Sequence, residues 1–304
     1  MNKKNLKLAI ILIILVALAY LYQGPFQKWK SDFEKPKNIF SGLNIEKTDK
    51  ITIARNKATT TLEKTGDRWK VGGTKDFYVN KNFSDELVKV LQNAKAAGIE
   101  LVSANKDKKT DFSVDEIKGT KVILSQEGKQ QTGFIIGKIG SDYASTYISQ
   151  PGNNNTYTVK EDFISAFIKP DWRDNVIFSG TKDKISKVRI QNLKNQIIIE
   201  NKDGKWAGTA PGKFSVNKDK VDKILDIMSS LVAQSIPEQN FKSSGLEKST
   251  LIVEASGDGI DNTIMVGKDN GKGEFYVKNG NSDNIYLITK EQKNTLDKTV
   301  TSLK

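Results

Sequence analysis

An unbroken apolar segment opens the chain, and short alternating runs of apolar and polar residues fill the rest of it. Residues 8–22 read LAIILIILVALAYLY without a charge, and three lysines stand just before them. An apolar run of this length lies at the low end for a helix that crosses a membrane. The pattern predicts a signal anchor, a transmembrane helix, over residues 1–23. Residues 24–45, with their Gly-Pro and Ser-Gly steps, read as a spacer.

Two other interpretations of the apolar segment stay open. Ala17-Leu18-Ala19 resembles the small-residue site of a signal peptide, and cleavage after Ala19 would make the protein secreted. The third interpretation is a buried core helix. Four aromatic residues between positions 20 and 29 resemble the belt at a membrane surface and favour the anchor. Anchor and signal peptide alike place residues 24–304 outside the cytoplasm.

Beyond residue 45 the sequence repeats itself. Residues 50–91 and 187–228, aligned without gaps, share ten identities in 42 positions. The identical pairs include Trp69/Trp206, Phe77/Phe214, Asn80/Asn217 and Asp85/Asp222. After a shorter loop in the second copy the match resumes in the same order, so that Tyr157 meets Tyr286. Such self-similarity predicts two copies of one structural unit.

Each copy shows the same series of expected elements. Short alternating runs with turn residues between them predict three strands, Lys50–Arg55, Thr59–Lys64 and Arg68–Val71, matched by Lys187–Gln191, Gln196–Asn201 and Lys205–Ala207. A helix follows, with Asn80 or Asn217 as its N-cap and apolar residues at helical spacing. Four more strands follow, at Lys121–Gln126, Gly133–Ile136, Ala144–Ser149 and Tyr157–Val159, and at Thr250–Ala255, Thr263–Val266, Glu274–Lys278 and Ile285–Ile288. A terminal helix closes each copy, over Lys160–Ile168 or Lys290–Leu303.

These elements predict an α+β fold of two tandem repeats, 46–175 and 176–304. Each repeat is expected to be an antiparallel sheet meander with one long packed helix and a short terminal helix. One N-terminal transmembrane helix is expected to precede both. The apolar stripe of each long helix is assigned to packing on the sheet rather than to a cofactor, and no cofactor is expected.

Composition narrows the possible functions. The net charge is +12 and comes almost wholly from lysines that alternate with Asp and Glu. Nucleic-acid binders usually cluster their basic residues and use Arg, so no nucleic-acid partner is expected, whereas an anionic envelope polymer is a possible one. The chain has no Cys and no His. Disulfides, zinc-thiolate sites and the commonest neutral-pH acid/base are thereby excluded.

Motif strings for catalysis and metal binding occur but lack their context. Three strings match those of class A β-lactamases: Ser179-Gly180-Thr181-Lys182, Ser282-Asp283-Asn284 and Lys64-Thr65-Gly66. That chemistry needs the serine at the start of a helix, whereas here it precedes an apparent strand. A Gly-rich turn holds Asp258, Asp261 and Asn262, but the 12-residue calcium loop with its closing Glu is absent. A hairpin turn is favoured there, and neither catalytic nor metal-binding residues are expected.

Five residues stand out as structural or interaction positions: Trp69, Trp206, Trp172, Arg173 and Asp174. The first two recur at one place of the repeat, which indicates a core position more strongly than a platform for ligand stacking. The other three stand where the copies join. Arg173 and Asp174 are expected to form an ion pair between the domains.

The repeat resembles the family of domain of unknown function 4340. The resemblance rests on the strand pair ending in Trp, on Val79-Asn80-Lys81 and Val216-Asn217-Lys218, and on the Trp-Arg-Asp join at residues 172–174. It covers about residues 45–300. Such proteins commonly carry one N-terminal membrane span, and some are encoded near ABC-transporter parts of the gliding-motility type. The resemblance therefore implies an accessory role in an envelope assembly and carries no catalytic residues.

Together these observations favour a non-enzymatic, membrane-anchored extracytoplasmic protein. The expected role is that of an accessory or scaffold component of an ABC-type transport or gliding-motility-like system. An alternative is an envelope protein that binds a polymer or carbohydrate, suggested by the net charge and the two repeated Trp positions.

Overall fold

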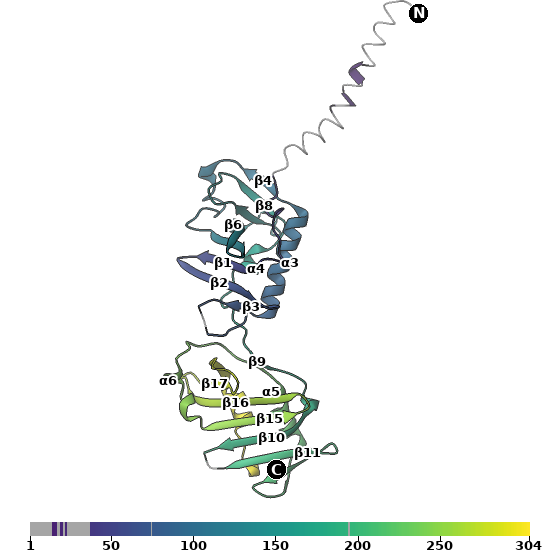
Figure 1. Ribbon diagram of the computed structural model, residues 1–304, viewed down its shortest axis with the longest axis vertical. Helices are drawn as coiled ribbons and strands as arrows, with labels where there is room; N and C mark the ends of the chain where they lie inside the picture. The colour runs from purple at the N-terminus through teal and green to yellow at the C-terminus, as the bar shows by residue number, and fades with distance from the viewer. Residues whose placement is uncertain (1–13, 17–18, 21, 23–36, 74, 194) are drawn as a thin grey trace, which may run out of the picture. The chain divides into compact units, whose positions relative to one another are not determined.

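The computed structural model describes residues 14–16, 19–20, 22 and 37–304, except residues 74 and 194 (Figure 1). The chain divides into two compact units. The first takes the residues up to Thr65 and Asn82–Pro170, and the second takes Gly66–Lys81 and Asp171–Lys304. The second unit thus includes a stretch of the first repeat, residues 66–81.

The first unit is built on an antiparallel sheet in the order β2-β1-β5-β6-β7-β8-β4. Its strands are β1 (Lys50–Arg55), β2 (Ala58–Thr65), β4 (Glu100–Ser103), β5 (Thr120–Gln126), β6 (Lys129–Ile139), β7 (Thr146–Ser149) and β8 (Thr156–Val159). Its helices are α3 (Lys81–Ala97), the 3-10 turn η2 (Lys106–Lys108) and α4 (Phe163–Phe167). Figure 1 shows α3 lying against the sheet.

The core of the first unit forms where this helix meets the sheet. The buried side chains of α3 are Leu87, Val90, Leu91 and Ala94, which recur at the spacing of one helix face. Phe40, fully buried, packs edge-on against Phe134 at a ring separation of 5.2 Å. Residues before β1 therefore belong to the folded unit.

The second unit repeats this sheet, with strand order β13-β12-β11-β10-β15-β16-β17-β18. Its strands are β3 (Arg68–Val71), β9 (Val176–Ser179), β10 (Ile185–Asn192), β11 (Gln196–Lys202), β12 (Lys205–Ala210), β13 (Phe214–Ser215), β14 (Ser230–Val232), β15 (Leu251–Gly257), β16 (Ile260–Asp269), β17 (Glu274–Asn279) and β18 (Tyr286–Thr289). Its helices are α5 (Lys218–Ser229), α6 (Phe241–Ser244), α7 (Lys290–Leu296), α8 (Val300–Leu303) and the 3-10 turns η3 (Lys182–Lys184) and η4 (Leu246–Lys248). A separate antiparallel pair joins β14 to β9.

The duplication predicted from the sequence is confirmed in strand order and in register. The order β2-β1-β5-β6-β7-β8 in one unit corresponds to β11-β10-β15-β16-β17-β18 in the other. Lys50 pairs with Glu63 and Lys187 with Glu200, and each lysine lies 3.0 Å from its glutamate. The Asn217 side chain accepts from the Lys220 N–H, as the predicted N-cap requires.

The predicted α+β class is wrong, because the chain consists mainly of antiparallel sheet. It has 40% strand and 24% helix. The expected terminal helices are much shorter than predicted. One spans only Phe163–Phe167 and stops before Lys169-Pro170, where proline disfavours helix. The other breaks at Asp297 into α7 and α8. The strands β4, β9, β13 and β14 were not predicted from the sequence, and of these β13 and β14, with two and three residues, are too short to show alternation.

Most of the predicted transmembrane helix over residues 1–23 lies outside the described residues. In the described part of the chain, no helix has the length and apolar character needed to cross a membrane. The predicted repeats, 46–175 and 176–304, differ from the compact units in assigning residues 66–81 to the first half.

Candidate functional site

The second unit holds an extended stretch of the first repeat, residues 76–80, which we call the docked segment. It lies between β3 and the residues that follow Asp171, with main-chain hydrogen bonds on both sides. These bonds run from Val79 N to Trp69 O at 2.8 Å, from Asn80 N to Trp172 O at 2.9 Å and from Asp174 N to Tyr78 O at 2.8 Å. The docked segment is therefore bound as a strand is bound in an antiparallel sheet.

Phe77 anchors the docked segment. Its side chain is 1% exposed and belongs to the hydrophobic core of the second unit. The ring meets the Tyr286 ring edge-on at 5.7 Å, and the Arg173 guanidinium carbon lies 5.1 Å from the ring centre. One buried aromatic side chain thus supplements the backbone bonds with apolar burial and a cation–π contact.

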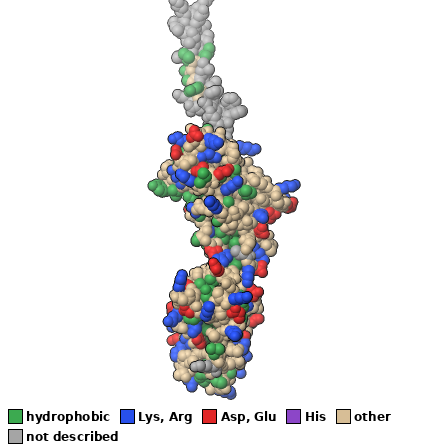
Figure 2. All heavy atoms as spheres, turned by 90° about the vertical axis from the view of Figure 1, so that its left-hand side faces the viewer, with side chains coloured by type: hydrophobic (Ala, Val, Ile, Leu, Met, Phe, Trp, Pro, Cys, Tyr) green, Lys and Arg blue, Asp and Glu red, His purple; other side chains and the backbone are tan. Residues whose placement is uncertain are grey.

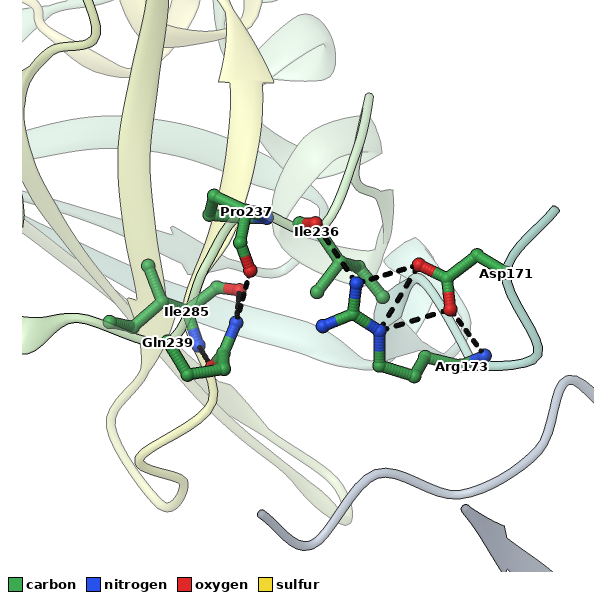
Figure 3. Close-up of polar contacts among 6 residues, drawn as sticks. All are labelled: Asp171, Arg173, Ile236, Pro237, Gln239 and Ile285. Carbon is green, nitrogen blue, oxygen red and sulfur yellow. Dashed lines mark hydrogen bonds and ion pairs between the residues drawn. The ribbon is translucent and has the colours of Figure 1, made fainter. Parts of the chain in front are cut away.

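Arg173 is fixed by a forked contact to Asp171 (Figure 3). Its Nη2 lies 2.7 Å from Asp171 Oδ2, and its Nε lies 3.0 Å from Oδ1. The same Nη2 donates to the Ile236 carbonyl at 3.1 Å. Partial burial opposes ionisation of Asp171, but hydrogen bonds from the Arg173 side chain and backbone outweigh it and hold the pKa of Asp171 below its ordinary value.

A glutamine braces the residue next to Tyr286 (Figure 3). The Gln239 amide nitrogen donates to the carbonyls of Pro237 at 2.9 Å and Ile285 at 3.0 Å. Its amide oxygen accepts from the Ile285 N–H at 2.8 Å. Both ends of this side chain are satisfied, so it holds Ile285 and the Tyr286 that follows it against residues 237–239.

A groove of about 850 Å³ remains open beside the docked segment. Arg68 stacks on the Tyr78 ring at 3.8 Å and donates to Asp174 Oδ2 at 3.2 Å. Lys70 lies 2.9 Å from Asp76 Oδ1, and this hydrogen bond raises the pKa of Lys70. Arg68 and Asp174, and Lys70 and Asp76, thus form ion pairs within the groove, whereas Asp283 is paired with Lys278 outside its lining.

Tyr286 lines the groove and is 7% exposed. Burial raises the pKa of its hydroxyl above the ordinary value, against a lowering hydrogen bond with Asn284. The hydroxyl therefore stays protonated at neutral pH and acts as a hydrogen-bonding group. Paired charges, amides and a protonated phenol together suit the recognition of a polar chain.

The structure brings four of the five predicted positions to this site. Trp69 and Trp172 contribute the carbonyls that bind the docked segment, and the Trp172 side chain is 5% exposed. The ion pair expected between Arg173 and Asp174 is not the one formed, since Arg173 binds Asp171 and Asp174 binds Arg68. All these residues lie within the second unit.

Trp206 lies elsewhere, in β12, half-buried against the core of the second unit. The sequence did not single out Phe77 or Tyr286 for this site, although both match their counterparts in the repeat. No signal pointed to Gln239, because its role depends on contacts across 46 positions of sequence.

Residues of two of the motif strings lie in a strand and in a turn. Ser179 lies in β9 rather than at the start of a helix, and Lys182 is paired with Asp226 at 2.8 Å. The turn at Asp258 joins β15 to β16 as an ordinary hairpin. Across the residues that the structure describes, no group of three Asp, Glu, His or Cys side chains is arranged to hold a metal ion.

Comparison with known families decides the affiliation. The model of the family described as domain of unknown function (DUF4340) matches residues 69–211 and 206–304. The chain belongs to the DUF4340 family. The two matched segments confirm the tandem copies, and the docked segment lies inside the first DUF4340 match. No curated protein and no solved structure matches the chain.

Proposed function

We propose that this DUF4340 protein is a non-enzymatic, extracytoplasmic scaffold that its N-terminal apolar segment holds at the membrane. The proposal rests on one observation, the binding of residues 76–80 in the second unit. Backbone hydrogen bonds combined with an aromatic anchor are the means by which sheets accept an extended strand from a partner. A module built this way gathers other polypeptides.

The partners proposed are subunits of an envelope assembly, of the ABC-type transport or gliding-motility-like kind. The family resemblance suggests this class. The whole sequence lacks His and Cys, which supports binding over catalysis. On the face in Figure 2, basic and acidic side chains alternate on each unit, so that neither sign of charge covers this face alone. Such a mixed surface suits a protein that binds charged partners.

Site-specific crosslinking in cells tests the scaffold proposal. A photoreactive residue at the exposed Asn281, which lines the groove beside the docked segment, is expected to capture one defined envelope protein. That protein should also copurify with the full chain from detergent-solubilised membranes. The matched control carries the photoreactive residue at Gly212, which has open space around it on the same unit. Repeated recovery of the chain alone, from both positions, would contradict the proposal.

A second candidate is binding of an anionic envelope polymer. Lys202, Lys205 and Lys213 line a groove of about 580 Å³ beside Phe214, and the one carboxylate there, Glu200, is already paired with Lys187. Binding of purified wall polymer should fall steeply with salt and weaken when the three lysines are changed to Gln. Absence of binding at low salt would rule this candidate out.

A further inference from the structure

Each unit carries a similar loop before the last strand of its repeat, β8 or β18. The loops are residues 150–155 in the first unit and 279–284 in the second. The repeated bonds are Asn153 N to Gln150 O at 3.2 Å and Ser282 N to Asn279 O at 3.1 Å, then Asn155 N to Asn153 Oδ1 at 2.9 Å and Asn284 N to Ser282 Oγ at 3.1 Å. In each loop the final asparagine also bonds the tyrosine two residues on. The two loops therefore share these hydrogen bonds, although Gly152 has a φ of +74° and its counterpart Asn281 has no positive φ.

In the second unit this loop contacts the docked segment. The Asn284 amide donates to the main-chain carbonyl of Asp76 at 3.3 Å, and Tyr286 meets the Phe77 ring. Asn284 is consequently only 6% exposed. Its counterpart in the first unit, Asn155, is half-buried and borders an open groove.

A stretch that borders the groove of the first unit also recurs in the second unit. Residues 39–42 and 177–180 both read Ile-Phe-Ser-Gly, and the two phenylalanines, Phe40 and Phe178, are 0% and 3% exposed. An asparagine precedes each stretch. The Asn38 amide donates to the Ala94 carbonyl, and the Asn175 amide donates to the Ala233 carbonyl, each at 3.0 Å. The stretch beside the groove of the first unit thus has a buried counterpart in the second unit.

The groove of the first unit, bordered by residues 39–42 and 150–155, has a volume of about 960 Å³. Amide side chains dominate its lining, which consists of Lys37–Ile39, Ser41, Gly42, Ala104, Gln130–Gly133 and Gln150–Asn155. Amides donate and accept at once, as a peptide backbone requires of its partner. Lys37 is the charged residue among those that line it, so the groove favours a neutral or acidic occupant.

We propose that this amide groove binds an extended segment of a partner protein, as the second unit binds residues 76–80. The inference rests on the proposed scaffold function and names its binding site. The main-chain carbonyl of the partner takes the place of the Asp76 carbonyl and accepts from Asn155. A second copy of this chain is a poor occupant, because its equivalent aromatic residue, Phe214, is packed over Gly208 of its own hairpin.

The probe is a fluorescent peptide with the sequence of residues 72–80, whose one lysine and one aspartate cancel, added to the purified full chain in detergent. A Cβ added to Gly42 would meet nothing within 4 Å, and the backbone there is not left-handed, so Gly42→Phe fills the groove without strain. We expect it to weaken peptide binding by about tenfold or more, whereas Gly212→Phe, equally open, leaves binding unchanged. Asn155→Ala removes one hydrogen bond and should weaken binding about fivefold.

Asn284→Ala is the matched control for Asn155→Ala, because it removes the equivalent amide from the second unit. If Asn284→Ala weakens binding and Asn155→Ala does not, the peptide has displaced the docked segment and the inference is overturned. Unchanged binding in Gly42→Phe overturns it as well. Binding of a wall glycan, and not of the peptide, that Gly42→Phe abolishes would assign the groove to a polymer instead.

The same variants separate this inference from the scaffold proposal. If Gly42→Phe abolishes peptide binding but no envelope protein copurifies with the wild-type chain, the groove binds peptides and the scaffold role fails. If the envelope partner copurifies equally with the wild-type chain and with Gly42→Phe, the scaffold role stands and the groove is not its docking site.

Discussion

Phe77 and Phe214 occupy one position in the two repeats and have different environments. The backbones around them have the same register. Lys70 forms an antiparallel β-bridge with Tyr78, and the equivalent residues of the second repeat, Ala207 and Ser215, pair in the same way. Yet Phe77 is 1% exposed inside the core of the second unit, whereas Phe214 is half-buried on its edge. The same strand pair is therefore used in two ways.

The residue across the strand pair accounts for the difference. In the second repeat it is Gly208, and a Cβ placed there would come within 2.1 Å of the Phe214 ring. The ring therefore lies flat over the glycine and covers its own hairpin. In the first repeat the equivalent residue is Val71, whose side chain is 9% exposed, and Phe77 belongs to the core of the second unit instead. Terminal repeats in repeat proteins close themselves in a comparable way.

The largest effect is expected from separating the second repeat from residues 66–81. A chain limited to residues 171–304 lacks Phe77 and the strand 76–80, so it should be largely unfolded or should expose its core to hydrophobic dyes. A peptide covering residues 66–81 should restore a cooperative unfolding transition, seen in circular dichroism. The same peptide with Phe77→Ala should fail. A stable fold of residues 171–304 alone would show that the docked segment is not part of its core.

The next largest effect is expected from shortening a single aromatic side chain to alanine in the full chain. Phe77→Ala empties a buried site and should lower the free energy of unfolding of the second unit by about 3–5 kcal/mol. Phe214→Ala removes a half-buried ring and should lower it by only about 1–2 kcal/mol. Denaturant unfolding followed by tryptophan fluorescence measures both, because Trp69, Trp172 and Trp206 all belong to the second unit. Equal losses would mean that the two rings are equivalent after all.

Replacing Gly208 should move the Phe214 ring away from its own hairpin, towards the arrangement that Phe77 has in the first repeat. Gly208→Val places a side chain where the Phe214 ring lies, so the ring must leave its hairpin, at a cost of about 1–3 kcal/mol. The displaced ring should make the chain self-associate, which sedimentation over a range of concentrations would detect. Gly212→Val, with open space around it, is the control and should stay as the wild type. A monomeric Gly208→Val chain of unchanged stability would refute this account.

Local patterns in the sequence predicted much of the sheet. β1 and β3 have the bounds that alternation indicated, and the repeat revealed the duplicated architecture before any contact was known. Helix content was overestimated because a few apolar residues after a strand look like one long helix until a proline or a cap interrupts them. Lys169-Pro170 and Thr299 are such interruptions.

The site was much harder to predict than the sheet. Trp172, Arg173 and Asp174 were noticed because they stand between the copies, but their partners were not. Arg173 takes the carboxylate two residues before it, and Asp174 takes Arg68 from 106 positions away. Such pairings depend on how the chain returns to the second unit with residues 66–81, and no periodicity in the sequence reports that path.

The smallest effect, and the one that distinguishes the two units by pH, concerns Asp171 and Asp142. Both have a pKa below the ordinary carboxyl value. Asp142, in the first unit, is lowered mainly by its hydrogen bond from Ser145, and Asp171 by those from Arg173, which outweigh its burial. A lowered pKa means that each carboxylate stabilises its unit at neutral pH and that this contribution is lost as the pH falls through the lowered pKa.

The free energy of unfolding of the second unit should fall as the pH falls from about 6 to 2, and we call this part of its pH dependence the acid limb. Asp171→Asn should make the acid limb less steep, as measured by unfolding followed by tryptophan fluorescence. The effect should be modest, since both partners of the Asp171–Arg173 pair are partly exposed to solvent. Asp142→Asn should leave that limb unchanged, because its contacts are confined to residues 142–145 of the first unit and act only there. Hydrogen exchange in β7 is the matching readout for the first unit. If Asp171→Asn leaves the acid limb of the second unit as steep as in the wild type, Arg173 does not stabilise the docking site through Asp171, and its contacts with Phe77 and Ile236 must suffice to hold the guanidinium in place.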